Sequence, residues 1–436
     1  MGRARLVLSL ALLCVLAGAV PAAHAGQWTE RRVLNMTHQG GEAEHPSGTM
    51  YAFRESLALG ADMLELDVQP TKDGHLVVLH DQSVARTTGV ARSVYDMTLA
   101  EVQRLDAAFN FVPGKGTAAD RPAGDYPLRG VRTGDKAPPP GYTPDDFRIP
   151  TLEEVLRAFP DIPTNIEIKG RSDADTDSFL RNADLLVALL KRVPHPPLVV
   201  VSFNQDAVDR FHAALPQIDV APGIVGMVTF VAAGLAPAGT QALQVPPVYS
   251  GIPIMTPDFV RRAHAQGFGV HVWFSGQEES ERVYERMLDM GVDGLMPAKP
   301  RALEAVLCRR GTPRPAGNPN HCGGGARHAA ATCVARVRQI SPVAGGRVTL
   351  TIARAEPDVR VACGGRAALR GPGRSKARYG SAPFLFPYGV RETRVELRVP
   401  KAAARRVRRG GKLAATAAAR VDGQRRDRVR RVTLRR

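Results

Sequence analysis

Strand-like and helix-like runs alternate along the first 300 of the 436 residues, and this alternation predicts an α/β barrel of the TIM type, (β/α)8. About 250 residues is the usual length of such a barrel of eight parallel strands, each followed by a helix. A change of charge and composition after residue 300 predicts a small C-terminal β-rich domain. The fold class is therefore α/β, with a second domain appended to the barrel.

The strand-like runs of the expected barrel are short and apolar, and helix-like runs separate them. The strand-like runs include VLNMTH (33–38), MLELDV (63–68), LVVLH (76–80), TNIEIK (164–169), LVVVSF (198–203), GVHVWF (269–274) and VDGLM (292–296). The helix-like runs include TMYAFRESLAL (49–59), TLEEVLRAF (151–159), FLRNADLLVALLKRV (179–193), PDFVRRAHAQG (257–267) and SERVYERMLDMG (280–291). A doubly wound open sheet is the alternative, but no G-x-G-x-x-G opens a helix after the first strand, so its dinucleotide-binding version has no support.

The first 25 residues have the pattern of a secretory signal peptide. Arg3 and Arg5 precede an apolar run that ends in Ala23-His24-Ala25, a small-x-small cleavage site before Gly26. No stretch reaches the roughly 20 apolar residues of a convincing membrane span. We expect an exported protein without a transmembrane segment, either secreted or associated with the cell envelope.

Four cysteines remain after removal of the signal peptide, at Cys308, Cys322, Cys333 and Cys363. An even number in an oxidising compartment predicts two disulfides, although the sequence does not define their pairing. A zinc site is the alternative. However, the spacing of the four cysteines includes no C-x-x-C pair, and no histidine lies at zinc-finger spacing.

Charge separates the two parts of the chain. Residues 301–436 hold 32 Lys+Arg against 7 Asp+Glu, whereas the first 300 residues hold 27 against 35. We place the barrel at 26–307, a Gly/Pro-rich linker with cysteines at 308–335, and a basic β-rich domain at 336–436. Alternating β-branched runs in that domain are VTLTIA, VRVAC, TRVELRVP and RVRRVTLRR.

The basic domain predicts attraction to an anionic surface of the cell envelope. A compositional bias toward arginine without a specific partner is the alternative. Aromatic residues are scarce among the arginines, so stacking on single-stranded nucleic acid has no support.

Polar residues gather at the expected carboxyl ends of the barrel strands, where TIM barrels carry their active sites. They are His38, Glu65, Asp67, His80, Glu167, Lys169 and Trp273. Three carboxylates without a cysteine suit a hard divalent cation such as Ca²⁺ or Mg²⁺. Two histidines can act as general acid and general base near neutral pH, and a lysine can neutralise phosphate oxygens. The set predicts phosphoryl chemistry, although Lys169 alone is equally well explained as a salt-bridge partner and Trp273 alone as core packing.

Several segments, in this order, resemble the glycerophosphodiester phosphodiesterase family over about residues 33–305. They are HQGG (38–41), GTMYAFRESLALGADMLELDVQPTKDGHLVVLHDQSVARTTG (48–89), RIPTLEEVL (148–156), NIEIK (165–169) and VWF followed by MLDMGVDGLMPAKP (272–300). The resemblance implies a small-molecule substrate, a glycerophosphodiester, which is hydrolysed to glycerol phosphate and an alcohol. It further implies His38 and His80 as the acid/base pair, Glu65, Asp67 and Glu167 as metal ligands, and Lys169 as a phosphate-side lysine.

Two positions depart from the family pattern. Gln39 stands where the family has the arginine of His-Arg-Gly, so a neutral amide replaces a bidentate cation. Ser47-Gly48 replaces the Glu-Asn of Pro-Glu-Asn-Thr, a loss of a carboxylate for which Glu42 or Glu44 can compensate. We expect Gln39, Lys169 and Trp273 to bind substrate, with an altered substrate preference.

Residues 106–148 match the place of a family insertion, and we expect them to cap the mouth of the barrel; a solvated excursion is the alternative. Two other functions stay open. One is a phospholipase D-like activity on lysophospholipids or sphingolipids. The other is a degenerate barrel that only binds the envelope, against which the intact acid/base and carboxylate residues speak.

Overall fold

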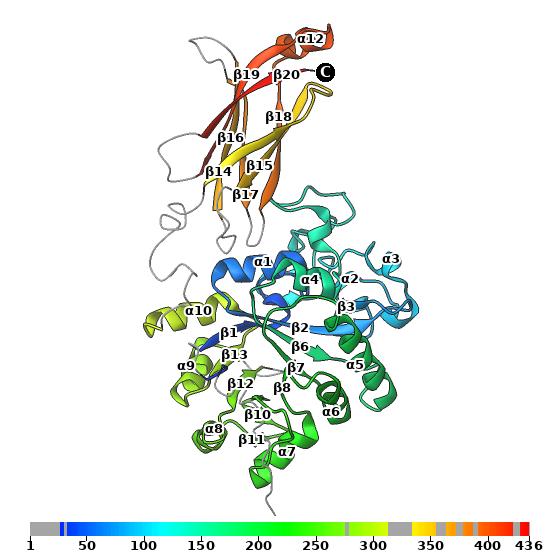
Figure 1. The fold of residues 1–436 in the computed structure, drawn as a ribbon, viewed down its shortest axis with the longest axis vertical. Coiled ribbons are helices and arrows are strands. Elements are labelled where there is room, and N and C mark those ends of the chain that lie inside the picture. The colour runs from blue at the N-terminus through cyan, green and yellow to red at the C-terminus, as the bar shows by residue number, and fades with distance from the viewer. Residues whose placement is uncertain are drawn as a thin grey trace, which may run out of the picture.

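A computed structural model of the chain describes residues 27–29, 33–274, 279–312, 334–354, 363–371, 378–386, 391–421 and 428–435 (Figure 1). The expected signal peptide, Cys322 and Cys333 lie outside these residues, and so does the side chain of Cys363. The disulfides therefore stay a prediction. Within the described ranges, no helix has both the length and the apolar character needed to cross a membrane.

Eight parallel strands form the barrel and pair in the order β8-β7-β6-β2-β1-β13-β12-β9. They are β1 (Leu34–Thr37), β2 (Met63–Pro70), β6 (Thr164–Ile168), β7 (Leu198–Val201), β8 (Asp219–Val220), β9 (Ala242–Val245), β12 (Gly269–Trp273) and β13 (Gly294–Met296). A single parallel bridge between Val220 and Thr240 brings β8 to the segment before β9 and nearly closes the ring. The predicted (β/α)8 barrel is confirmed.

A helix follows each barrel strand, and the helices surround the barrel (Figure 1). They are α1 (Met50–Leu59), α4 (Leu152–Ala158), α5 (Thr176–Leu190), α6 (Gln205–Ala214), α7 (Ile224–Ala233), α8 (Pro257–His264), α9 (Glu281–Asp289) and α10 (Pro300–Arg309). In α1, the Thr49 side chain accepts a hydrogen bond from the backbone N–H of Ala52 and caps the helix. Gly60, with φ of 116°, ends it in a left-handed conformation that favours glycine.

The inside of the barrel is apolar at its amino end and polar at its carboxyl end. At the amino end, Trp28 packs with apolar side chains of the strands and donates a hydrogen bond of 2.7 Å to Asp219. Further up, the Gln244 side chain donates a 2.6 Å hydrogen bond to Asn165. Because side chains alternate along a strand, the residue two positions beyond Asn165, Glu167, also faces inward.

The run 76–80 does not form a barrel strand, which corrects the sequence prediction. Strand β3 (Leu76–Val78) pairs antiparallel with the end of β2, outside the parallel ring. Only five residues, 71–75, connect the two strands, and a parallel crossover needs a dozen or more. The turn includes Gly74 with φ of 82°. His80 therefore reaches the mouth from a hairpin.

The insertion at 106–148 has its own small core and is not a solvated excursion. Ala108, Val131, Tyr142 and Phe147 are buried together in it. The short elements of the insertion are β4 (Phe111–Val112), β5 (Gly116–Thr117), η3 (Ala123–Asp125) and η4 (Pro144–Phe147). Before it lie α2 (Ala85–Thr88), η2 (Val94–Asp96) and α3 (Leu99–Val102).

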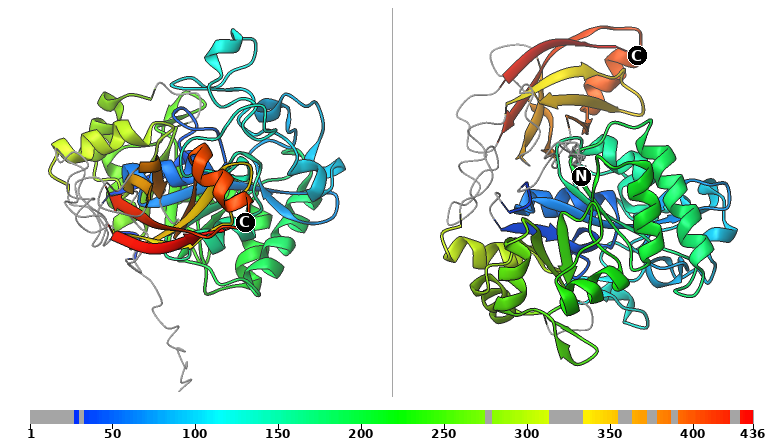
Figure 2. Two further views of the ribbon diagram at one scale, coloured as in Figure 1. Left: turned by 90° about the horizontal axis from the view of Figure 1, so that it is seen from above. Right: turned by 60° about the horizontal axis from the view of Figure 1, so that its bottom comes forward.

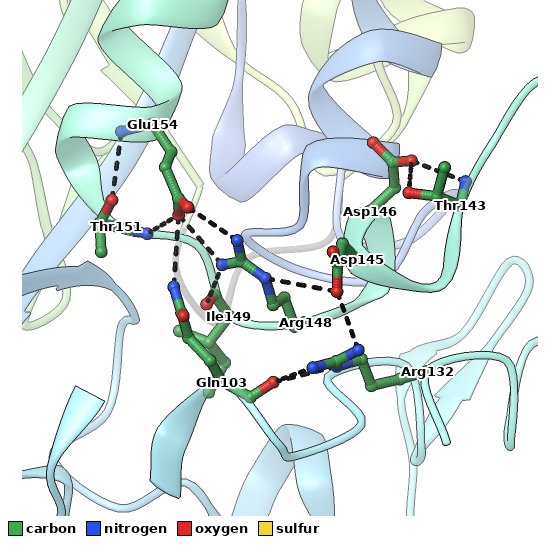
Figure 3. Close-up of polar contacts among 9 residues, drawn as sticks. All are labelled: Gln103, Arg132, Thr143, Asp145, Asp146, Arg148, Ile149, Thr151 and Glu154. Atoms are coloured by element: carbon green, nitrogen blue, oxygen red, sulfur yellow. Dashed lines mark hydrogen bonds and ion pairs between the residues drawn. The ribbon is translucent and has the colours of Figure 1, made fainter. Parts of the chain in front are cut away.

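Figure 3 shows how polar contacts connect the insertion to the barrel. Arg148 donates two hydrogen bonds to the carboxylate of Glu154 in α4, at 3.0 and 2.7 Å. Arg132 donates to the backbone carbonyl of Gln103 and to Asp145, the latter at 2.9 Å. Such forked arginine contacts hold both partners in a defined orientation. The insertion is thus part of the folded barrel domain.

The C-terminal part is β-rich, as the sequence predicts, and contains two antiparallel sheets (Figures 1 and 2). One has the order β14-β15-β18 and the other β17-β16-β19-β20. Their bounds are β14 (Ala335–Ile340), β15 (Arg347–Arg354), β16 (Cys363–Arg370), β17 (Arg378–Phe386), β18 (Glu392–Arg398), β19 (Leu413–Val421) and β20 (Arg428–Leu434). Buried apolar residues from both sheets form one core.

Replacing Phe147 with alanine should lower the free energy of unfolding of the barrel by about 3–5 kcal/mol, the usual cost of truncating a buried phenylalanine. The ring is fully buried and stacks on Tyr51 with centroids 4.8 Å apart. Urea denaturation followed by tryptophan fluorescence measures this, because the chain's two tryptophans, Trp28 and Trp273, both lie in the barrel. Phe109→Ala, at a 36% exposed position of the same insertion, is the control. Equal losses in the two variants would mean that the insertion lacks a core.

Candidate active site

The first strand-end loop carries His38 and Gln39 in a short 3-10 turn, η1 (His38–Gly40). Gln39 has φ of 47°, an uncommon conformation for a residue other than glycine. Its backbone N–H donates a 2.9 Å hydrogen bond to the Glu65 carboxylate. The turn therefore joins β1 to the carboxylates of β2, and strained backbone of this kind is common at functional sites.

Three carboxylates from two neighbouring strands converge at the mouth, as predicted. Glu65 and Asp67 of β2 and Glu167 of β6 each offer an oxygen, and these oxygens lie within 4.8 Å of one another. The parallel register places Asp67 directly beside Glu167. Strand β2 continues beyond them to Pro70, so the two residues lie within the strand and not at its end.

The carboxylates of the acidic cluster are crowded, and two of them, Glu65 and Asp67, are buried. Burial and the neighbouring carboxylates raise the pKa of Glu65 to about 8, and burial also raises the pKa of Glu167. Asp67 is 2% exposed, and its Oδ2 has no hydrogen-bond partner within the described residues. Crowded, buried oxygen ligands of this kind fit a hard divalent cation such as Ca²⁺ or Mg²⁺.

Lys169 follows β6 and points to the same cluster. Its Nζ lies 2.7 Å from Glu167 and 3.2 Å from Asp67. Burial lowers the pKa of Lys169, but the two carboxylates outweigh burial and raise it above its ordinary value. The positive charges of Lys169, His80 and His38 hold the pKa of Asp67 below its ordinary value in spite of burial. Lys169 therefore stays protonated and carries a positive charge.

His38 is oriented by Glu42, a residue that the sequence suggested only as a replacement carboxylate. The His38 Nδ1 lies 2.6 Å from Glu42, and its Nε2 lies 3.9 Å from Glu65. Burial lowers the pKa of His38, but Glu42, Glu65 and Asp67 raise it to about 10. Glu44 instead accepts a hydrogen bond from the Arg301 backbone. Of the two carboxylates, Glu42 is the one that contacts His38.

His80 has a carboxylate partner of its own, Asp81. The His80 Nδ1 lies 2.6 Å from Asp81, whose other oxygen accepts a 2.6 Å hydrogen bond from Arg86. Burial lowers the pKa of His80, yet the bond to Asp81 and the charge of Asp67 raise it above its ordinary value. His80 and Arg86 lower the pKa of Asp81 to about 2, despite its burial. Asp81 is therefore ionised at neutral pH.

Arg86 also reaches Gln39, the position at which the sequence departs from the family. The Arg86 Nη2 donates to the Gln39 side-chain oxygen at 3.3 Å, and Ser47 donates to the same oxygen at 2.6 Å. A guanidinium group is thus present beside the neutral amide, supplied from helix α2. An arginine at position 39 would place two guanidinium groups together.

Trp273, at the end of β12, lies at the mouth as predicted and faces an aromatic neighbour. Its ring centroid is 5.7 Å from that of Phe203, in an edge-to-face arrangement. The Lys169 Nζ lies 5.6 Å from the same Phe203 ring. One wall of the site is therefore apolar and exposed, because Phe203 is 39% accessible.

The structure brings together all eight residues that the sequence singled out, and it adds four that sequence reasoning missed as site residues. The additions are Glu42, Asp81, Arg86 and Phe203. Glu42 stands four residues after His38, and Asp81 directly follows His80, so local spacing was a usable signal. The contact of Arg86 with Gln39, across 47 positions, has no such signal.

The chain was compared with known families and proteins. Residues 38–301 match the model of the glycerophosphoryl diester phosphodiesterase family. A glycerophosphodiester phosphodiesterase of Caldanaerobacter subterraneus is 30% identical and covers 64% of this chain and 99% of its own. One of Bacillus subtilis is 29% identical, with 69% and 95% covered. Lysophospholipase D GDPD1 of Mus musculus is 26% identical, with 63% and 85% covered.

A solved structure from Silicibacter pomeroyi, assigned to the same family, aligns with a TM-score of 0.50 at 21% identity and covers 65% of this chain and 96% of its own. This likeness agrees with the barrel fold. The family model covers more than half of the chain and includes each predicted site residue. The chain belongs to the glycerophosphoryl diester phosphodiesterase family and is an enzyme of that class.

Proposed function

We propose that the enzyme hydrolyses glycerophosphodiesters to glycerol 3-phosphate and an alcohol, with His38 and His80 as the acid/base pair and a divalent cation at Glu65, Asp67 and Glu167. The observation that carries the proposal is the pairing of each histidine with its own carboxylate at 2.6 Å, on two different loops beside one acidic cluster. The names of the curated relatives agree with this substrate class.

The two histidine–carboxylate pairs leave one nitrogen of each ring for chemistry. Glu42 and Asp81 each engage an Nδ1, so the Nε2 atoms are the positions at which protons are donated or accepted. Hydrolysis needs one proton removed from the attacking water and one delivered to the oxygen of the departing alcohol. The bond between phosphorus and that oxygen breaks as the bond to the water oxygen forms.

Positive charge for the phosphate comes from Lys169, which contacts the acidic cluster, and from Arg86, which contacts Gln39. A divalent cation held by the three carboxylates, Ca²⁺ or Mg²⁺, would stabilise negative charge on the phosphate oxygens. We propose that Gln39, oriented by Ser47 and Arg86, and Trp273, beside Phe203, contact the substrate.

The setting of the enzyme is proposed from the sequence. The N-terminal pattern at 1–25 supports export, either secreted or retained at the cell envelope. The excess of arginine in the C-terminal domain supports retention on an anionic envelope surface.

Lysophospholipids are a second candidate substrate class, cleaved in the manner of a phospholipase D. The exposed Phe203 ring beside Lys169 favours this candidate, because a lysolipid adds an apolar chain to the same phosphodiester. A curated relative carries the name Lysophospholipase D.

Glu65→Gln should abolish divalent-cation-dependent hydrolysis and weaken cation binding, because the change removes a ligand charge at almost constant volume. Hydrolysis of glycerophosphocholine with and without chelator measures the first effect, and calorimetric titration with Ca²⁺ and Mg²⁺ measures the second. Glu44→Gln is the matched control, since Glu44 lies nearby but outside the cluster. Cation affinity equal to wild type in Glu65→Gln would remove Glu65 from the ligand set.

His38→Ala and His80→Ala should each reduce kcat by about 10²-fold or more, the usual scale for positioned acid/base groups. Steady-state kinetics on glycerophosphocholine measure the loss, and tryptophan fluorescence checks the fold. His75→Ala, an exposed histidine in the turn between β2 and β3, serves as control. A loss below about tenfold at His38 or His80 would leave that residue outside proton transfer.

Arg86→Gln should raise KM and lower kcat, together reducing kcat/KM by at least about tenfold, because hydrogen bonds to charged groups contribute about 1.5–3 kcal/mol. Arg86→Lys should recover only part of the loss, since an ammonium group cannot reproduce the forked contacts to Asp81 and Gln39. The control is Arg92→Gln, which removes an exposed pair with Glu101. Full recovery by lysine would mean that only the charge matters, and unchanged kinetics in Arg86→Gln would remove Arg86 from the site.

A further inference from the structure

The stretch 220–257 contains no charged residue and no histidine over 38 consecutive positions. It includes α7, β9 and the hairpin of β10 (Val248–Tyr249) and β11 (Ile252–Pro253). Elsewhere the sequence is rich in charge, with 23% Asp, Glu, Lys and Arg. Figure 1 places α7 and the hairpin at the edge of the barrel opposite α1. An uncharged segment of this length needs a physical reason, since it contributes to the surface.

Exposed apolar side chains concentrate in and next to this stretch. Seven of the nine exposed large apolar residues in the described part of the chain lie between 203 and 252. Six of them, which we call the apolar rim, follow the carboxyl ends of β7, β8 and β9: Phe203, Ile224, Val225, Val228, Tyr249 and Ile252. Soluble surfaces rarely gather so many such residues, and an exposed patch of this kind marks an interaction site.

Helix α7 is apolar all the way round. Gly226 and Phe230 face the barrel and are buried, whereas Val225 and Val228 are 66% and 60% exposed on the outer side. The polar residue of the helix, Thr229, donates its hydroxyl hydrogen to the Val225 carbonyl at 2.9 Å. A helix that is apolar on every side is stable when the outer face is also covered. The neighbouring α6 differs, because its Arg210 forms an exposed ion pair with Asp184.

The apolar rim is continuous with the active site. The backbone N–H of Ile224 donates to the Phe203 carbonyl at 3.1 Å, so α7 starts next to Phe203, whose ring lies beside Lys169 and Trp273. In a TIM barrel the helix after a strand begins at the carboxyl, catalytic face. Whatever covers the rim therefore lies next to the phosphate-side lysine.

We propose that the apolar rim docks on the surface of a zwitterionic lipid aggregate, a micelle or bilayer, and admits a lysophospholipid from it to the active site. The admission of a lysophospholipid to the active site rests on the proposed phosphodiesterase function. Docking on the lipid surface does not depend on it. The absence of charge between 220 and 257 means that this stretch itself carries no ion to be desolvated when the rim enters the boundary between head groups and acyl chains. An exposed tyrosine such as Tyr249 suits that boundary, since its ring is apolar and its hydroxyl polar.

The test of docking is co-sedimentation of the full mature chain with phosphatidylcholine vesicles at high salt, where attraction through the basic C-terminal domain is screened. Wild type should sediment with the vesicles. The double variant Val225→Asp with Val228→Asp should bind the vesicles at least about tenfold more weakly, a change that equals about 1.4 kcal/mol in binding free energy. Val228→Ser is a milder variant that should show a smaller loss. Ala213→Asp, which adds a charge to the exposed side of α6, should bind as wild type does.

Three results would overturn the docking proposal. The first is equal vesicle binding by wild type and the double variant, and the second is no binding by wild type. The third is a wild-type dimer in analytical ultracentrifugation that the double variant dissociates, which would make the rim an interface between copies of this chain.

The same variants separate docking from catalysis. The double variant should hydrolyse soluble glycerophosphocholine at the wild-type rate and aggregated lysophosphatidylcholine more slowly. Equal rates on the aggregated lipid would refute admission of substrate from its surface. Failure of wild type to hydrolyse either substrate would instead refute the proposed function, while the vesicle result would still decide docking.

Discussion

The buried contact among Lys169, Asp67 and Glu167 is the constraint on which the active site depends. Parallel pairing of β2 with β6 sets Asp67 beside Glu167, so two like charges occupy adjacent strands inside a barrel. Buried charges without partners are strongly unfavourable, and Lys169 compensates part of this charge at 2.7 and 3.2 Å. Burial and the neighbouring carboxylates raise the pKa of Glu65 to about 8. Strand register therefore keeps Glu65, Asp67 and Glu167 close together, an arrangement that fits a divalent cation.

The rest of the catalytic mouth is organised around that cluster in two halves. His38 and Glu42 come from the first strand-end turn, and His80 and Asp81 come from the β2–β3 hairpin. Arg86 joins the halves, because it contacts Asp81 and also Gln39, the residue next to His38. The neutral amide at position 39 is thus accompanied by a guanidinium group from another element. The departure from the family pattern therefore leaves a guanidinium group in contact with position 39.

Some elements of the structure could not be predicted from the local sequence. The run LAATAAARV of β19 is alanine-rich and has weak strand propensity, while KAAARRVR, of similar composition, forms helix α12 (Lys401–Arg408). Strand β19 lies between β16 and β20 and pairs with both along its length. Two neighbouring strands supply its backbone hydrogen bonds and override propensity. The predicted strand-like run VRVAC (359–363) lies outside the described residues except for Cys363, at which β16 begins.

The sequence by itself determined the barrel, the β-rich character of the C-terminal part, and the eight residues that meet at the mouth. It did so because strand and helix periodicities are local, and because the carboxyl ends of parallel strands converge at one face of the barrel. His80 is the exception, since it reaches that face after the antiparallel strand β3. Only the tertiary structure decided that 76–80 is a hairpin strand, that Arg86 serves Gln39, and that the outer face of α7 is uncovered. Each of these depends on which distant segments pack together. Such contacts arise from the folded chain as a whole, so no local pattern of residues reports them.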